Sequence, residues 1–148
     1  MEIKYFNSNF DKITQNKDTD QSITNLIEKL PSLNIVSDKN LLEETIKISN
    51  QFKEKKEKII VFGTGGSNLG ARALNNIISN NKIILEFYDN VDPINFEKNF
   101  QNINFELTGF LVISKSGTTP ETLSQFSCLY QKAIEANKVE DFFSNTLI

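Results

Sequence analysis

Two short segments of this chain are built from residue types that bind anions. Residues 63–70 read Gly-Thr-Gly-Gly-Ser-Asn-Leu-Gly, and residues 114–122 read Ser-Lys-Ser-Gly-Thr-Thr-Pro-Glu-Thr. Glycines let backbone N–H groups approach a ligand closely, hydroxyls donate hydrogen bonds, and a helix beginning at such a loop adds positive partial charge. Together the two loops predict one anion, a phosphate, held from two sides.

Neither loop fits a nucleotide-binding fingerprint. In the dinucleotide pattern Gly-x-Gly-x-x-Gly counted from Gly63, the third glycine is replaced by Asn68. A P-loop requires Lys and then Ser or Thr after its last glycine, whereas Gly70 is followed by Ala71 and Arg72. The spacing therefore argues against both kinds of nucleotide site. Arg72 is left out of the predicted site because it lies inside the following helix.

Apolar strand-like runs alternate with helical patterns along the chain. The order β-α-β-α-β-α predicts an α/β fold with three layers, in which a parallel sheet lies between helices on both faces. The run at 59–62 is apolar at every position and is predicted to be a strand buried on both faces. The expected strands are 59–62, 82–88 and 110–113, with a fourth beginning at 146, and the expected helices are 22–30, 38–52, 69–81, 92–100 and 120–134.

Several details of packing follow from the same patterns. Pro31 is expected to end a helix before a short connection, and the charged run 53–58 is interpreted as a solvated helix end. Cys128 is expected to be a buried thiol, and residues 142–143 are placed in a connection. The face of the last helix that packs on the sheet is predicted to hold Leu123, Phe126, Tyr130, Ala133 and Ile134.

The composition limits the classes of function. The chain has 148 residues, enough for a core, and a net charge of −3, which argues against a nucleic-acid surface. It has no histidine and one cysteine, so we expect no metal site and no histidine-based catalysis. Residues 1–20 are polar and irregular, with no apolar signal core, and no run is long enough to cross a bilayer, so we expect a cytoplasmic protein that does not bind membranes.

Some loop residues also have a purely structural interpretation. Ser67 could be the N-cap of the helix that it opens, and Thr118 with Glu121 fits a capping box that precedes a first turn containing Pro120. Glu121 is therefore interpreted as a cap and not as a catalytic base. Capping and phosphate binding are compatible, because both use the same end of the helix.

The pair of loops resembles the sugar isomerase (SIS) domain and, within it, the glucose-6-phosphate isomerase family. The order of the loops, the strands before them and the helices after them also match. The resemblance covers roughly residues 40 to 148, so we expect an N-terminal helical segment over 1–40 and a partial SIS domain over 41–148. Because the chain stops where a fourth strand begins, we expect it to be the N-terminal part of a longer protein.

The resemblance implies a function and a set of site residues. The family interconverts glucose 6-phosphate and fructose 6-phosphate in glycolysis and gluconeogenesis, without a cofactor and as a homodimer. Its catalytic residues would lie beyond residue 148, so this segment alone is predicted to be inactive. The alternative is a non-catalytic SIS module that binds or senses a sugar phosphate. The implied phosphate-binding residues are Ser67, Ser114, Lys115, Ser116 and Thr119, supported by Gly65, Gly66 and Gly117.

Overall fold

The computed structural model of this chain describes residues 17–78 and 82–148. The expectations for residues 1–16 and for a helix end at 80–81 lie outside this range. The chain forms two compact units, one extending to Ile46 and the other beginning at Lys47, and each is described by itself.

The first unit is helical. The first helix ends at Lys29, just before Pro31, as predicted, but Pro31 then begins a short helix, because its fixed φ suits a first helical turn. The expectation of a plain connection there was therefore wrong. Asp38 begins the next helix by accepting a hydrogen bond from the Leu41 N–H at 3.0 Å. The elements are α1 (Lys17–Lys29), α2 (Pro31–Asn34), a 3₁₀ turn (Ile35–Ser37) and α3 (Lys39–Phe52), which continues into the second unit.

The second unit is built on a four-stranded parallel sheet. Its strands lie in the order β2-β1-β3-β4, so the first strand lies inside the sheet and later strands are added on both sides of it. In register, Phe62 of β1 lies between Tyr88 of β2 and Val112 of β3. This confirms the predicted α/β class and the parallel sheet. The strands are β1 (Lys58–Phe62), β2 (Ile84–Tyr88), β3 (Thr108–Val112) and β4 (Thr146–Leu147).

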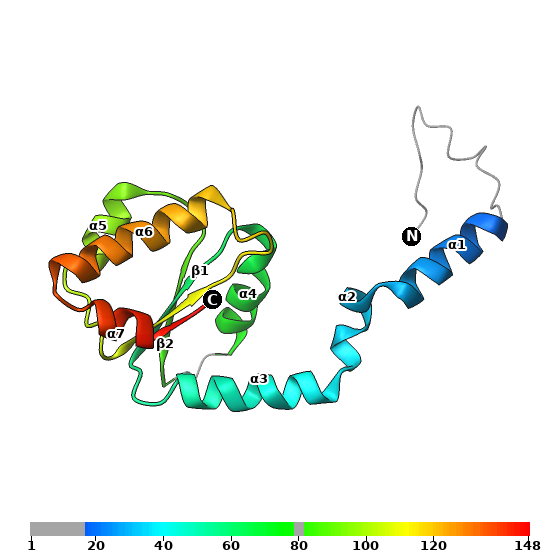
Figure 1. Ribbon diagram of the computed structural model, residues 1–148, viewed down its shortest axis with the longest axis horizontal. Helices are drawn as coiled ribbons and strands as arrows, with labels where there is room; N and C mark the ends of the chain where they lie inside the picture. The colour runs from blue at the N-terminus through cyan, green and yellow to red at the C-terminus, as the bar shows by residue number, and fades with distance from the viewer. Residues whose placement is uncertain (1–16, 79–81) are drawn as a thin grey trace. The chain divides into compact units, whose positions relative to one another are not determined.

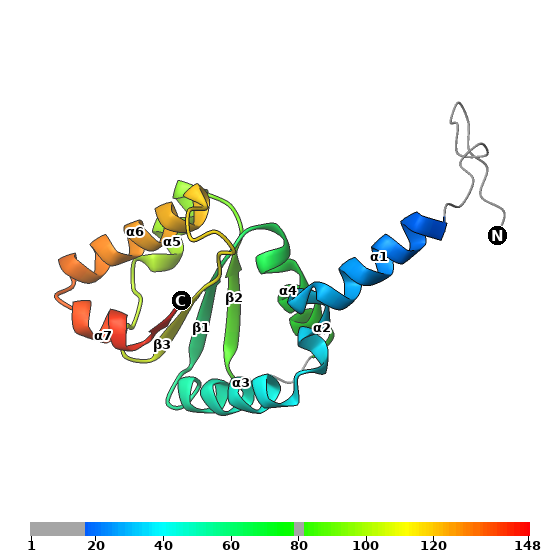
Figure 2. The same cartoon turned by 45° about the vertical axis from the view of Figure 1, so that its right-hand side comes forward.

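Helices lie on both faces of this sheet. Figures 1 and 2 show α5, α6 and α7 along one face and α4 along the other. Residues 142–143 belong to α7 and not to a connection, which corrects the prediction. No helix within 17–78 and 82–148 has the length and apolar character needed to cross a membrane. The helices are α4 (Leu69–Ile77), α5 (Pro93–Phe100), α6 (Pro120–Glu135) and α7 (Val139–Ser144).

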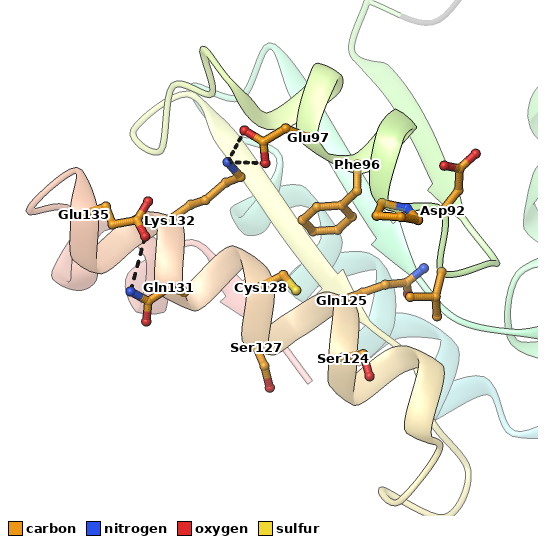
Figure 3. Close-up of a pocket in the computed structure, with 12 residues that line it drawn as sticks. Asp92, Phe96, Glu97, Ser124, Gln125, Ser127, Cys128, Gln131, Lys132 and Glu135 are labelled. Atoms are coloured by element: carbon orange, nitrogen blue, oxygen red, sulfur yellow. Dashed lines mark hydrogen bonds and ion pairs between the residues drawn. The ribbon is translucent and has the colours of Figure 1, made fainter.

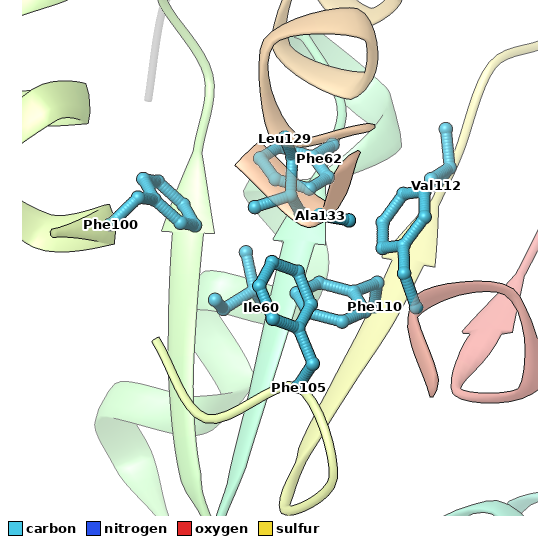
Figure 4. Close-up of a cluster of buried hydrophobic side chains, with 9 residues drawn as sticks. Ile60, Phe62, Phe100, Phe105, Phe110, Val112, Leu129 and Ala133 are labelled. Carbon is cyan, nitrogen blue, oxygen red and sulfur yellow. The ribbon is translucent and has the colours of Figure 1, made fainter. Parts of the chain in front are cut away.

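The core lies between the sheet and the layer formed by α5, α6 and α7 (Figure 4). Alternate residues of β1 and β3 point into it, as the two-residue repeat of a strand requires. Val61, on the opposite face of β1, is also buried, so the central strand is covered on both sides as predicted. The core residues are Ile60, Phe62, Phe100, Phe105, Phe110, Val112, Leu129, Ala133 and Phe142.

The buried face of α6 differs from the predicted one. Leu123, Tyr130 and Ile134 are exposed, whereas Thr122 and Gln125 are buried with Leu129 and Ala133. The apolar pattern misled the prediction because two polar side chains are enclosed near the start of the helix. Cys128 lies on the exposed side of α6, so the expectation of a buried thiol was wrong.

The charged run at 53–58 is only partly a solvated helix end. Lys58 is the first residue of β1 and pairs with Glu86 of the neighbouring strand at 2.8 Å. The ammonium of Lys56 donates hydrogen bonds to the Glu106 carbonyl oxygen and the Asn145 side chain. Burial, followed by repulsion from Lys55, lowers the pKa of Lys56. These lysines therefore support the amino-terminal edge of the sheet.

Candidate functional site

The two loops lie over the carboxyl ends of adjacent strands. The connection that leaves β1 leads to β2 on one side of it, and the connection that leaves β3 leads to β4 on the other side. The gap between β1 and β3 is therefore the point at which the strand order reverses. Ligands of open α/β sheets bind outside the carboxyl ends of the strands at this point. The topology thus brings residues 63–68 and 113–119 to one position.

The first loop comes into direct contact with the second. A side chain at Gly63 would lie 3.0 Å from the Ser67 Cβ and 3.3 Å from the carbonyl oxygen of Ile113. Only a residue without a Cβ fits there without displacing its neighbours. The loop then turns through a 3₁₀ segment, Gly65–Ser67, in which Gly65 has a φ of +54°. The glycines therefore allow Ser67 to fold back against Gly63.

Asn68 follows Ser67 and is fully buried, and the sequence did not single it out as a site residue. Its Nδ2 donates a hydrogen bond of 2.7 Å to the Gly63 carbonyl oxygen. Asn68, and not Ser67, occupies the N-cap position of α4, so the capping interpretation of Ser67 was wrong. An Asn before an apolar helix is usually interpreted as a cap, which is why the sequence concealed this contact.

The second loop is held by its own hydroxyls. The Ser114 and Thr119 hydroxyl oxygens lie 3.0 Å apart, and the Gly117 N–H donates to Ser114 at 3.1 Å. Thr118 donates from both its backbone N–H and its hydroxyl to the Ser116 oxygen, at 3.2 and 3.0 Å. Ser114 and Thr119 therefore form one pair of hydroxyls, and Ser116 forms a second pair with Thr118; these two pairs make up the hydroxyl cluster of the second loop.

The helix after this loop begins at Pro120 as predicted, but its N-cap lies one residue later than predicted. Thr119 occupies the N-cap position of α6, with Pro120 as the first helical residue, and Thr118 lies before it. Thr118 directs its hydroxyl to Ser116 instead of to the helix, so the predicted capping box of Thr118 and Glu121 was wrong. The 16-residue α6 nevertheless presents its amino-terminal end, which favours anions, to this loop.

Two basic side chains near the loops have different environments. Arg72 in α4 forms an ion pair with Asp89 at 3.0 Å, so its charge is matched at the end of β2. Lys115 is exposed, and no acidic group in the described part of the chain forms an ion pair with it. Lys115 is therefore the cation of the loops that is available to an anion.

The backbone of Tyr88, the last residue of β2, contacts the first loop. Its carbonyl oxygen accepts a hydrogen bond from the Gly63 N–H at 3.3 Å. Burial, followed by the neighbouring Glu86 carboxylate, raises the pKa of the Tyr88 phenol to about 12. A phenol with this pKa is neutral near pH 7, so Tyr88 cannot act as a general base there.

Two cavities differ in their relation to the loops. The larger, about 530 Å³, is a groove between α5 and α6 that lies outside both loops; Lys132 and Glu97 form an ion pair across it (Figure 3). The smaller, about 370 Å³, is lined by Ser114, Gly117 and Thr122 together with apolar residues. We place the candidate site at the loops because hydrogen-bond donors, and not volume, determine where an anion binds.

Known proteins are similar to this chain in sequence and fold. A family model described as phosphoglucose isomerase matches residues 16–148. The chain belongs to the phosphoglucose isomerase family. A glucose-6-phosphate isomerase of Borreliella burgdorferi is 32% identical over 117 residues, which cover 74% of this chain and 22% of that protein. A glucose-6-phosphate isomerase of Campylobacter jejuni is 36% identical over 95 residues, which cover 62% of this chain and 23% of that protein.

Solved structures support the phosphoglucose isomerase fold. A glucose-6-phosphate isomerase from Chlamydia trachomatis superimposes with a TM-score of 0.57 at 27% identity, covering 64% of this chain and 19% of that one. A hypothetical protein of Thermus thermophilus superimposes with a TM-score of 0.61 at 26% identity, covering 70% of this chain and 26% of that one. The chain spans about a fifth of the length of the curated relatives that it matches.

Proposed function

We propose that the two loops bind the phosphate group of a sugar phosphate. Ser67 would donate from the first loop, and Ser114, Lys115, Ser116 and Thr119 from the second. Gly65, Gly66 and Gly117 would let backbone N–H groups approach the phosphate oxygens. The observation that carries this proposal is the hydroxyl cluster at the reversal of strand order, beside an exposed lysine.

Binding would require the second loop to exchange hydrogen bonds. Ser114 and Thr119 now bond to each other, as do Thr118 and Ser116. A hydroxyl proton rotates freely and can be redirected to a phosphate oxygen, which only accepts. Hydrogen bonds to a charged acceptor are roughly twice as strong as neutral ones, so this exchange favours the ligand.

The proposed whole reaction is the interconversion of glucose 6-phosphate and fructose 6-phosphate. In this proposal the chain is the N-terminal part of a cytoplasmic, homodimeric isomerase, and it anchors the substrate by its phosphate. Such anchoring orients the sugar, but proton transfer between carbons also needs a base within hydrogen-bond reach. The chain contains no histidine, and Glu121 lies in the first turn of α6, so we expect no turnover by this segment alone.

The decisive variant removes two hydroxyls of the second loop, Ser116→Ala with Thr119→Ala. Glucose 6-phosphate is titrated into the 148-residue chain while backbone amide shifts are followed by NMR. We expect saturable shifts in the unmodified chain and their loss in the variant, because each bond to a charged group contributes about 1.5–3 kcal/mol.

The matched control is Ser124→Ala with Ser127→Ala, which removes two exposed hydroxyls from α6, beside the larger groove. This control should bind like the unmodified chain. Equal binding by all three proteins would refute the phosphate site. A longer protein that contains this chain and binds the sugar phosphate without converting it would favour the alternative of a sensing module.

A further inference from the structure

The side chain of Asn68 forms an unusual contact inside the first loop. It is fully buried, and its Nδ2 lies 2.7 Å from the carbonyl oxygen of Gly63. A carbonyl oxygen only accepts, so the amide nitrogen and not the amide oxygen must face it. The amide oxygen of Asn68 has no hydrogen-bond partner among the residues that the structure describes.

This contact is not a helix cap. Asn68 stands at the N-cap position of α4, yet its side chain accepts no hydrogen bond from an N–H of that helix within the described residues. The side chain instead reaches back five residues along the chain. A cap would satisfy the amide oxygen with a free N–H of the first helical turn. Helix stability alone therefore does not account for an asparagine here.

The contact closes the loop at both of its ends. The N–H of Gly63 is bonded to Tyr88 of β2, and the carbonyl of Gly63 is bonded to Asn68. The backbone of Asn68 accepts a hydrogen bond from the Arg72 N–H at 2.9 Å in the first turn of α4. One buried side chain thus joins the end of β1 to the start of α4, with Ser67 and its neighbouring glycines held between them.

We infer that Asn68 is a positioning residue for phosphate binding. It holds the 3₁₀ turn Gly65–Ser67, in which the Ser67 N–H donates to the Thr64 carbonyl oxygen at 3.1 Å, against the end of β1. This role rests on the proposed function of that site. An unpartnered buried amide oxygen lowers stability. Such a local cost is typical of positions kept for binding.

The test uses the 148-residue chain, Asn68→Ala, and inorganic phosphate as the probe, with binding followed by amide shifts in NMR. We expect the dissociation constant to rise by about fivefold or more, because the loop must be ordered at the expense of binding energy. The control is Asn145→Ala at the amino-terminal end of the sheet, which removes a similar bond from Nδ2 to the Phe105 carbonyl oxygen at 2.8 Å together with the hydrogen bond from the Lys56 ammonium. It should lower the melting temperature and leave the dissociation constant unchanged.

A second variant, Asn68→Asp, keeps the shape of the side chain and makes its donor depend on pH. A protonated carboxyl can donate to Gly63, whereas a carboxylate repels the carbonyl oxygen. The ratio of the dissociation constants of variant and unmodified chain should therefore fall as pH is lowered through the pKa of the new carboxyl. Taking the ratio cancels the titration of phosphate itself.

The outcomes separate the two proposals. If Ser116→Ala with Thr119→Ala abolishes binding while Asn68→Ala only lowers the melting temperature, the positioning role is refuted and the phosphate site remains. A ratio for Asn68→Asp that is independent of pH also refutes the positioning role. If the unmodified chain shows no saturable shifts with phosphate, the phosphate site itself is refuted, and the positioning role with it.

Discussion

The two loops lie at the same end of the sheet but are held there by different interactions. The first is held by its backbone, by the close approach of Gly63 to the second loop and by the buried amide of Asn68. The second is held by hydrogen bonds among the hydroxyls that are proposed to bind phosphate. The first loop therefore offers a preformed surface, whereas the second must exchange partners when a ligand binds.

This difference assigns separate tasks to the loops. A preformed backbone surface loses little conformational entropy on binding, which favours affinity. Hydroxyls that satisfy each other keep their loop ordered without a ligand, yet they can turn toward an anion. Substitutions that disturb the first loop should therefore alter stability together with binding, whereas removal of hydroxyls in the second should chiefly alter binding.

The largest effect is expected from Gly63→Ala. The added methyl group would lie 3.0 Å from the Cβ of Ser67, a residue of the proposed site, and 3.3 Å from the carbonyl oxygen of Ile113, which precedes the second loop. We expect the free energy of unfolding to fall by about 2 kcal/mol, as for overpacking in a tight site, together with a loss of phosphate binding. Urea denaturation and the phosphate titration measure the two effects.

The control for this prediction is Gly66→Ala, since nothing lies within 4 Å of a Cβ built there. It should leave the unfolding free energy nearly unchanged while weakening phosphate binding. Equal stability of Gly63→Ala and Gly66→Ala would contradict a close contact between the loops.

An intermediate effect is expected at the two glycines with positive φ. Gly65 and Gly117 have φ values of +54° and +69°, one in each loop, with open space around each. Replacing either by alanine forces an L-residue into the left-handed region, which costs about 1 kcal/mol. Urea denaturation should give similar losses for both. A much smaller loss at Gly117 would mean that the second loop changes its backbone conformation readily.

The smallest effect concerns pH and the support of the first loop. The backbone carbonyl of Tyr88 accepts a hydrogen bond from the Gly63 N–H, and the backbone carbonyl of Phe62 accepts one from the Ile113 N–H. Of these two supporting residues, only Tyr88 also carries a side chain that titrates. The pKa of Tyr88 is raised from 10 to about 12, so below pH 10 both the folded and the unfolded chain carry the phenol proton. Between pH 10 and 12 only the unfolded chain loses it, so this contribution to stability falls as pH rises.

Tyr88→Phe removes that titration. The unfolding free energy of the unmodified chain should lose about 1 kcal/mol more than that of the variant between pH 9 and 12, after allowance for solvent screening. Urea denaturation at both pH values measures the difference, and the absorbance of tyrosinate follows the phenol directly. Parallel losses in the two proteins would show that the Tyr88 phenol titrates alike in both states.

Local patterns predicted most of the secondary structure. The runs 59–62 and 110–113 are uniformly apolar, and each leads into a loop of small polar residues, so they marked strands before binding loops. Asp92 before Pro93 correctly marked the start of α5, where its carboxylate accepts from the Ile94 and Asn95 N–H groups. These signals lie within a few residues of each other, and steric and capping rules act at that range.

Contacts between segments distant in the chain could not be predicted from the sequence. Phe142 was assigned to a connection, but it is fully buried in the core because α7 forms there. Thr122 and Gln125 are buried, although the predicted packing face of this helix did not include them. Neighbours brought in by the fold decide burial, and no local pattern of polarity reports them.

By itself, the sequence determined the class of the fold, the order of its elements and the two loops that resemble those of sugar isomerases, because residue type and spacing act locally. Only the tertiary structure decided that both loops meet between β1 and β3, that Arg72 pairs with Asp89, and that Asn68 closes the first loop on Gly63. The reason is physical: which strands become neighbours, and which side chains they enclose, depends on packing the whole sheet against its helices.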